Sequence, residues 1–323
     1  MLLFALACTP DDQYQTKDLD PEDTEPVEAD ADTDADADAD ADVPQKIVRF
    51  IAMGDGGEGN PDQYAVAAAV KDVCDAQGCD FVMYLGDNFY DDGVDDINDS
   101  QFDTKFEQPY ADLPYRFYVV LGNHDFGQLS LLEYKADIEV EYTGKSDKWY
   151  MPDRYYSWTQ EHVDFFALDT NELMIWNRDD QHVWIKDQLA ASTGDWKIAL
   201  GHHPYKSNGQ HGDAGSYEGL DWLPFSNGAT IKEFMDDNLC GQVDLYLCGH
   251  DHNRQWLEPV CGTNFIVTGA AAKTTDFRHD GNNTLFADDQ TEGFVWIEII
   301  DNTLRGQVWN KDGVMEFEHT ITK

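Results

Sequence analysis

Residues 81–90 read FVMYLGDNFY: five apolar residues, then a glycine and an aspartate, and a tyrosine three positions after that aspartate. A short run of five apolar residues that ends at a glycine is typical of a buried β-strand. The polar residues therefore lie just past the end of a strand. Six segments of the chain contain glycine and polar side chains of this kind, and all but the one around His211 follow an apolar run. They are Gly54-Asp55-Gly56-Gly57, Gly86-Asp87-Asn88-Phe89-Tyr90, Gly122-Asn123-His124-Asp125, Gly201-His202-His203-Pro204, Gln210-His211-Gly212 and Gly249-His250-Asp251-His252.

The spacing of apolar residues around these segments predicts strands that alternate with helices and then a β-rich end. Expected strands are 46–53, 81–85, 115–121, 162–168, 196–200 and 243–248, with further strands between 264 and 320. Expected helices begin at Pro61 and cover 129–138 and 179–191. This order favours a layered α/β sandwich in one domain that begins near Val43. Ligands of such folds gather beyond the carboxyl ends of strands, where five of the six segments are expected.

The side chains in these segments are ligands for metal ions. Carboxylates, an amide oxygen, imidazoles and a phenol suit iron, zinc or manganese rather than copper(I). An aspartate can bridge two ions through its two oxygens. Tyr90 is informative because a phenolate is a poor ligand for zinc at neutral pH and a good one for ferric iron, and its spacing from Asp87 lets both reach one ion. The residues thus predict a two-metal site, which is suited to attack on phosphate esters.

The ordered set of segments resembles that of the purple acid phosphatases, within the calcineurin-like metallophosphoesterases, and especially the small tartrate-resistant acid phosphatase group. The resemblance covers roughly residues 47–270 and includes Leu247-Cys248-Gly249-His250-Asp251-His252-Asn253. It implies a four-layer α/β/β/α sandwich of two mixed β-sheets flanked by helices. It also implies a binuclear acid phosphatase that hydrolyses phosphate monoesters by attack of a metal-bound hydroxide.

The resemblance assigns a role to each matching residue. Asp55, Tyr90 and His252 would bind Fe³⁺; Asn123, His202 and His250 would bind a divalent ion (Fe²⁺, Zn²⁺ or Mn²⁺); and Asp87 would bridge the two ions. His124 and His211 would be catalytic: they would hydrogen-bond the phosphoryl oxygens, and one would help to protonate the leaving alcohol. Of the residues beside the ligands, Asn88 and Asp125 are expected to orient their neighbours, whereas His203 and Asp251 are not ligands in the family. Whether His203 contacts the substrate is open at this point.

The net charge of −43 limits the partners of the chain. An acidic protein is not expected to bind nucleic acid or anionic lipid through charge, and it repels phosphate unless local positive charge compensates. Acidic surfaces also suit salty surroundings. Expected partners are small phosphate esters or phosphorylated macromolecules, and the protein is expected to be a monomer.

The first 44 residues carry 15 of the 64 acidic residues and a single lysine. Residues 1–8, MLLFALAC, resemble a shortened signal with a lipobox-like end, so Cys8 is a candidate for lipid attachment. Residues 9–44 contain an Ala-Asp repeat and are expected to be a disordered acidic tether, because like charges repel and no apolar side chains offset the ordering entropy. The catalytic domain is expected at 45–323. This organisation predicts export, either as a bacterial cell-envelope lipoprotein (periplasmic or surface) or as a secreted protein.

Five further cysteines fit an oxidising compartment. Cys74 and Cys79 are close enough in sequence to close a small loop, and Cys240 and Cys261 flank the Gly249–His252 motif and are a possible pair. Cys248 lies in an apolar run and is expected to be a buried free thiol. Spacing alone does not establish these pairings.

Two other functions use the same residues. A phosphodiesterase or nucleotidase would need the same metal ligands, because its specificity lies in the loops. A non-catalytic surface binding protein would be expected to have lost ligands, and all seven are present. Open at this point are the natural substrate, the second metal, and whether a loop such as Thr170–Asp180 represses activity.

Overall fold

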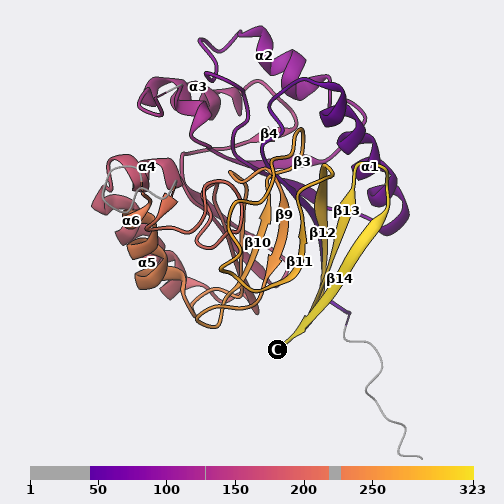
Figure 1. Cartoon of the computed structure of the whole chain (residues 1–323), viewed down its shortest axis with the longest axis vertical. Helices are drawn as coiled ribbons and strands as arrows, with labels where there is room; N and C mark the ends of the chain where they lie inside the picture. The colour runs from indigo at the N-terminus through magenta and orange to yellow at the C-terminus, as the bar shows by residue number, and fades with distance from the viewer. Residues whose placement is uncertain (1–43, 128, 218–226) are drawn as a thin grey trace, which may run out of the picture. The chain divides into compact units, whose positions relative to one another are not determined.

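The computed structural model describes residues 44–127, 129–217 and 227–323. Two seven-stranded sheets form its centre (Figure 1). In spatial order, the first sheet contains β14 (Met315–Thr322), β13 (Thr303–Asn310), β12 (Gly293–Ile300), β1 (Ile47–Met53), β2 (Phe81–Leu85), β3 (Arg116–Val120) and β4 (Trp149–Tyr150). The second contains β11 (Thr284–Asp288), β9 (Arg254–Leu257), β10 (Asn264–Thr268), β8 (Leu245–Cys248), β7 (Trp196–Leu200), β6 (Val163–Ala167) and β5 (Tyr156–Gln160).

Both sheets are mixed. In the first, β1, β2, β3 and β4 run parallel, whereas β12, β13 and β14 are antiparallel to their neighbours. In the second, β6, β7, β8 and β10 form the parallel part. The parallel strands β2 and β6 are buried along their whole length, as expected of strands covered on both faces. This parallel arrangement directs the carboxyl ends of β1, β2 and β3 to one edge of the sheet.

The two sheets pack face to face through aromatic side chains. Phe50 of β1 and Phe81 of β2 each make edge-to-face contact with Phe165 of β6, with ring centroids 5.7 and 5.4 Å apart. Such pairs contribute about 0.5–1.5 kcal/mol each beyond the burial of their area. The main core therefore lies between the sheets and fixes the position of one sheet relative to the other.

Helices cover the outer faces and complete the four layers that the resemblance implied (Figure 1). They are α1 (Pro61–Gln77), α2 (Ser100–Phe102), α3 (Glu133–Tyr142), α4 (Thr170–Ile175), α5 (Asp179–Ala191) and α6 (Ala229–Phe234). Two π-helices, η1 (Asp103–Glu107) and η4 (Met235–Leu239), and one 3-10 helix, η2 (His124–Phe126), accompany them. A second apolar core joins α4, α5 and α6 to the outer face of the second sheet through Leu173, Ile185 and Phe234. No helix in the described ranges has the length and apolar character needed to cross a lipid bilayer.

Two local expectations were wrong. The helix expected over 129–138 begins at Glu133, because Ser130 adopts a left-handed backbone with φ 56°, which an α-helix excludes. The segment Thr170–Asp180, expected as a loop, contains α4. Asp169 caps this helix by accepting a hydrogen bond from the backbone of Glu172 at 2.8 Å.

The cysteines pair as the sequence suggested. Disulfides join Cys74 to Cys79 and Cys240 to Cys261, and Cys248 is a buried free thiol. Residues 44–323 form one compact unit. The expected signal-like segment at 1–8, and the tether at 9–44 apart from its last residue, lie outside the described residues.

Candidate metal centre

The candidate site is formed by loops that follow five parallel strands of the two sheets. Asp55 follows β1, Asp87 and Tyr90 follow β2, and Asn123 follows β3; His202 follows β7, and His250 and His252 follow β8. The structure brings all seven expected ligands together. Asp55, Asp87 and His250 have left-handed backbones, with φ 60°, 53° and 69°. Non-glycine residues adopt this conformation at a cost, and such residues cluster at functional sites.

Two glycines make room for the carboxylates. A Cβ atom at Gly122 would lie 2.2 Å from Oδ1 of Asp87, and one at Gly249 would lie 2.3 Å from Oδ2 of Asp55. Both distances are far shorter than any non-bonded contact, so only glycine fits at these positions. The glycines of the motifs thus serve close packing of the loops around the site.

Tyr90 lies at the centre of the first group of ligands. Its hydroxyl oxygen lies 2.9 Å from Oδ1 of Asp55, 2.8 Å from Oδ2 of Asp87 and 3.1 Å from Nε2 of His252. Burial raises the pKa of Tyr90 well above its ordinary value, and the carboxylates of Asp55 and Asp87 raise it further. A phenolate at this position therefore requires a bound cation to compensate its charge.

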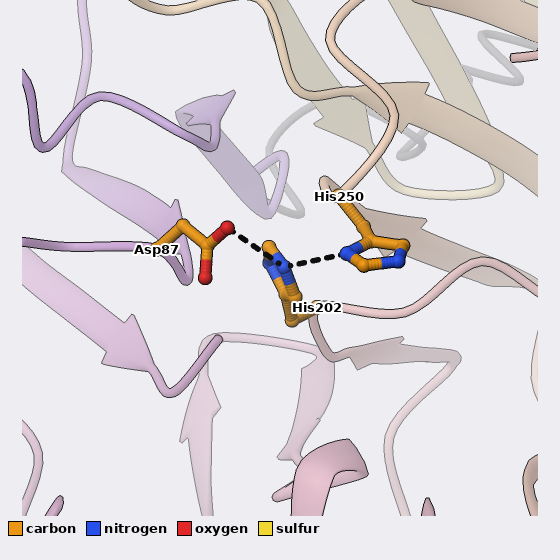
Figure 2. A group of neighbouring side chains, drawn as sticks. All are labelled: Asp87, His202 and His250. Atoms are coloured by element: carbon orange, nitrogen blue, oxygen red, sulfur yellow. Dashed lines mark hydrogen bonds and ion pairs between the residues drawn. The ribbon is translucent and has the colours of Figure 1, made fainter. Parts of the chain in front are cut away.

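His202 lies at the centre of the second group. Its Nε2 atom lies 3.4 Å from Oδ2 of Asp87, 3.2 Å from Oδ1 of Asn123 and 3.1 Å from Nδ1 of His250. Figure 2 shows His202 between Asp87 and His250. Nδ1 of His202 is 2.8 Å from the carbonyl oxygen of Leu85. Because a carbonyl oxygen can only accept, the proton of a neutral His202 ring is on Nδ1. This leaves the lone pair of Nε2 available for a metal ion.

The charges around His202 and His250 differ. Burial disfavours a charged His202, but Asp87 and Asp55 outweigh this effect and raise its pKa to about 9. Burial lowers the pKa of His250 well below its ordinary value, and the nearby His211 and His203 lower it further. His250 is therefore neutral, the form that binds metal ions.

Asp87 belongs to both groups. Ligand atoms of Asp55, Asp87 and His252 lie within 4.8 Å of one another, and so do those of Asp87, His202 and His250. A carboxylate shared by two adjacent sets of hard and borderline donors fits a bridged pair of ions. The buried cluster is thus a metal-binding site of the two-metal kind.

Hydrogen bonds beneath the site hold its loops. Oδ1 of Asp125 accepts from the backbone nitrogens of Asn88 and Phe89 at 2.8 and 3.1 Å, and Oδ2 accepts from that of Gly122 at 2.7 Å. The side-chain amide of Asn88 donates to Asp125 and, at 3.0 Å, to Glu139 of α3. Asp125 and Asn88 therefore orient the loops, as expected. Glu139 was missed, because nothing in the helix pattern indicates that it is buried.

His124 lies against the first ligand group, and His211 lies against the second. The His124 ring packs against Tyr90, with centroids 4.6 Å apart, and its Nδ1 lies 2.7 Å from the carbonyl oxygen of Asp91. The His211 ring stacks on His250 at 3.9 Å. Each imidazole thus lies against an expected metal ligand.

A cavity of about 190 Å³ opens beside the second group. Its walls include Asn123, His250 and His211, together with His203, Met174 and Tyr217. The sequence left open whether His203 contacts the substrate and did not indicate Tyr217 at all, because neither matches a ligand position. The pair His202-His203 was the available signal.

Comparisons with known proteins agree with this geometry. The family model described as calcineurin-like phosphoesterase matches residues 48–254. The chain is 32% identical over 261 residues to tartrate-resistant acid phosphatase type 5 of Sus scrofa, covering 70% of each chain. It is 30% identical over 251 residues to purple acid phosphatase 7 of Arabidopsis thaliana, covering 69% of this chain and 70% of that one.

Two solved structures share the fold. Purple acid phosphatase PPD1 from yellow lupin (Lupinus luteus) superposes with a TM-score of 0.67 at 18% identity, covering 86% of this chain and 54% of that one. GAP50, the anchor in the inner membrane complex of Plasmodium, superposes with a TM-score of 0.66 at 23% identity, covering 85% and 89%. Since an anchor protein and a phosphatase share this fold, the ligands and not the fold must decide the function.

Proposed function

Because this chain belongs to the calcineurin-like phosphoesterase family, we propose that it is a binuclear-metal acid phosphatase that hydrolyses phosphate monoesters. The observation that carries the proposal is the convergence of all seven donors, including the phenol of Tyr90, around the shared carboxylate of Asp87. The similarity to acid phosphatases of animals and plants supports the same reaction.

The donor groups would divide between two ions. Asp55, Tyr90 and His252 would hold Fe³⁺, Asn123, His202 and His250 would hold Fe²⁺, Zn²⁺ or Mn²⁺, and Asp87 would touch both. When bound, the two ions would neutralise the phosphate and lower the pKa of water enough to supply a nucleophile near neutral pH. Iron in the first position is favoured by the phenol of Tyr90, which is a better ligand for ferric iron than for zinc.

His124 and His211 are proposed to act on the substrate directly. They lie on either side of the ligands, against Tyr90 and His250, so a phosphoryl group held between them meets an imidazole on each side. An imidazole within hydrogen-bond reach of the substrate can donate to a phosphoryl oxygen or deliver a proton to the leaving alcohol. The contact of one imidazole with each ligand group supports a division of these two roles between them.

Hydrolysis of two chromogenic esters tests the proposal. The metal-loaded protein should hydrolyse 4-nitrophenyl phosphate at acidic pH and act much more slowly on bis(4-nitrophenyl) phosphate. Replacing the shared carboxylate (Asp87→Asn) should lower kcat at least about 100-fold, a typical loss when a central electrostatic group is removed. Preference for the diester would indicate the phosphodiesterase alternative, and no hydrolysis of either ester by the loaded protein would favour a binding protein.

Export is proposed on the basis of the two disulfides, which form and persist in oxidising compartments. Non-reducing peptide mapping of the protein isolated from its host would test the pairing. Mass spectrometry of the N-terminal peptide would test lipid attachment at Cys8. A fully reduced protein in the cell would contradict the proposal.

A further inference from the structure

His203 lies next to a proposed metal ligand but is not one, and its hydrogen bonds determine which of its ring nitrogens carries the proton. Its Nδ1 lies 2.8 Å from Oγ1 of Thr170. The same oxygen accepts hydrogen bonds from the backbone nitrogens of His202, at 3.3 Å, and His203, at 3.1 Å. A hydroxyl has two lone pairs and one hydrogen, so these two bonds fill the lone pairs of Thr170.

The hydroxyl hydrogen of Thr170 therefore forms the hydrogen bond between Oγ1 of Thr170 and Nδ1 of His203. Nδ1 of His203 accepts it, and the proton of the neutral ring is on Nε2. That nitrogen is buried and has no hydrogen-bond partner within the described part of the chain. An unpaired buried donor is costly, by about 1–3 kcal/mol, so its presence calls for a partner that arrives with a ligand.

The position of His203 indicates what that ligand is. His203 is fully buried from solvent and lines the cavity of about 190 Å³, together with Asn123, His211 and His250. Asn123 and His250 belong to the second ligand group, so a phosphate held there would extend its oxygens into the same cavity. The oxygens of a phosphate dianion are acceptors, which match an N–H donor.

The surroundings strengthen such a bond. Met174 and Tyr217 form the apolar part of the cavity wall, and the ring of Tyr217 lies roughly parallel to that of His203, with centroids 6.2 Å apart. The carbonyl of His203 accepts from the hydroxyl of Tyr246 at 2.9 Å, which fixes the backbone. A fixed, buried donor forms a stronger hydrogen bond to an anion than one in water.

We infer that His203 contacts the substrate, donating a hydrogen bond from Nε2 to a non-bridging phosphoryl oxygen, and that Thr170 is the positioning residue that fixes this tautomer. The inference rests on the proposed function. His203 would be the third imidazole at the substrate, besides His124 and His211, and it would donate its hydrogen bond as a neutral ring. No bond to phosphorus is formed or broken by it.

Paired substitutions test the donor. His203→Phe keeps a flat ring but removes the N–H, whereas His203→Gln places an amide nitrogen near the position of Nε2. The metal-loaded proteins are compared by the Kd of inorganic phosphate, measured by titration calorimetry, and by kcat and KM for 4-nitrophenyl phosphate. His182→Phe is the matched control, because His182 lies on α5, hydrogen-bonded to Asn177 and outside the cavity.

His203→Phe should raise the phosphate Kd and lower kcat/KM by about 10- to 100-fold, the range for a hydrogen bond to a charged group. His203→Gln should retain most of the affinity, and Thr170→Val should fall between wild type and His203→Phe because it no longer selects the tautomer. Bound metal should be unchanged in all of them. Equal losses in the Phe and Gln variants, or a phosphate Kd unchanged by His203→Phe, would overturn the inference.

Three further outcomes are informative. If His203→Phe fails to fold or to hold metal, Thr170→Val still decides, and wild-type phosphate affinity in that variant would overturn the inference. If the wild-type protein binds phosphate but hydrolyses no monoester, the proposed function fails while the calorimetric series still tests His203. A loss of kcat/KM without a change in phosphate Kd would assign His203 to the leaving group and contradict the stated contact.

Discussion

The ammonium nitrogen of Lys273 lies 3.3 Å from the centroid of the Tyr90 ring, and it forms an ion pair with Glu58 at 2.6 Å. Lys273 comes from the loop after β10, and Tyr90 comes from the loop after β2. The only positive charge on the ring face of this proposed iron ligand, within the described residues, is thus supplied from the other sheet. A cation over an aromatic face is attracted by the electrons of the ring.

This contact predicts a change in colour. A cation beside a phenolate lowers the energy of its electrons, so more energy is needed to transfer one to ferric iron. Lys273→Met should therefore move the visible absorption band of the iron-loaded protein to longer wavelength. Lys71→Met, which removes a surface lysine paired with Asp75, should leave the band in place. An unchanged band in Lys273→Met would show that the lysine does not act on an iron-bound Tyr90.

The hydrogen bonds of Asp125 predict an effect on metal affinity. This carboxylate holds the backbone of the loop that carries Asp87 and Tyr90 and also that of the loop that carries Asn123. Asp125→Asn replaces one of the two acceptor oxygens by an NH2 donor, so one of the loops loses its hydrogen bonds to this side chain. The substitution should weaken metal binding about 10- to 100-fold, as is typical for groups that orient ligands. Competition with a chelator would measure this loss. The exposed Asp187→Asn should bind metal as the wild type does, and equal affinities in both variants would contradict the account.

The pKa of Glu133, a residue outside the metal site, predicts how the free energy of unfolding depends on pH. Hydrogen bonds from Arg178, assisted by Arg154, hold its pKa at about 2, below the ordinary value of 4.5. A depressed folded-state pKa contributes stability above the unfolded pKa, and that contribution is lost as the pH falls from about 4.5 to 2. Because the group is partly exposed, its contribution is about 1 kcal/mol.

Denaturant unfolding should therefore show Glu133→Gln to be about 1 kcal/mol less stable than wild type at pH 7, with the difference vanishing near pH 2. Lys71→Met at the exposed pair with Asp75 gives a reference for a lost surface ion pair. A difference that stays constant across this range would show that the arginines do not act through the charge of Glu133.

The sequence predicted the elements whose apolar pattern is locally complete. Phe81–Leu85, Asp179–Ala191 and Trp196–Leu200 have the expected bounds, because their burial follows from the strand or helix period alone. The ligands were predictable for a related reason: each follows the end of such a strand. The start of α3 was not predictable, since the left-handed backbone of Ser130 depends on the loop that it belongs to.

The contact between Thr170 and His203 shows the limit of sequence reasoning at the site. The two residues are 33 positions apart and meet only because α4 packs beside the loop after β7. The Asp169-x-x-Glu172 spacing was a local signal for that helix, but nothing local indicates what its first residue touches. Contacts fixed by the packing of distant elements require the structure.

Tyr90 is the residue that would bind ferric iron in the proposed two-metal phosphatase. A visible absorption spectrum of the purified protein, with iron quantified on the same sample and on Tyr90→Phe, tests this assignment most directly. We expect a broad band that gives a purple or pink colour and is lost in Tyr90→Phe. A colourless, iron-free protein that is nonetheless loaded with other metals and active on phosphate esters would contradict the assignment.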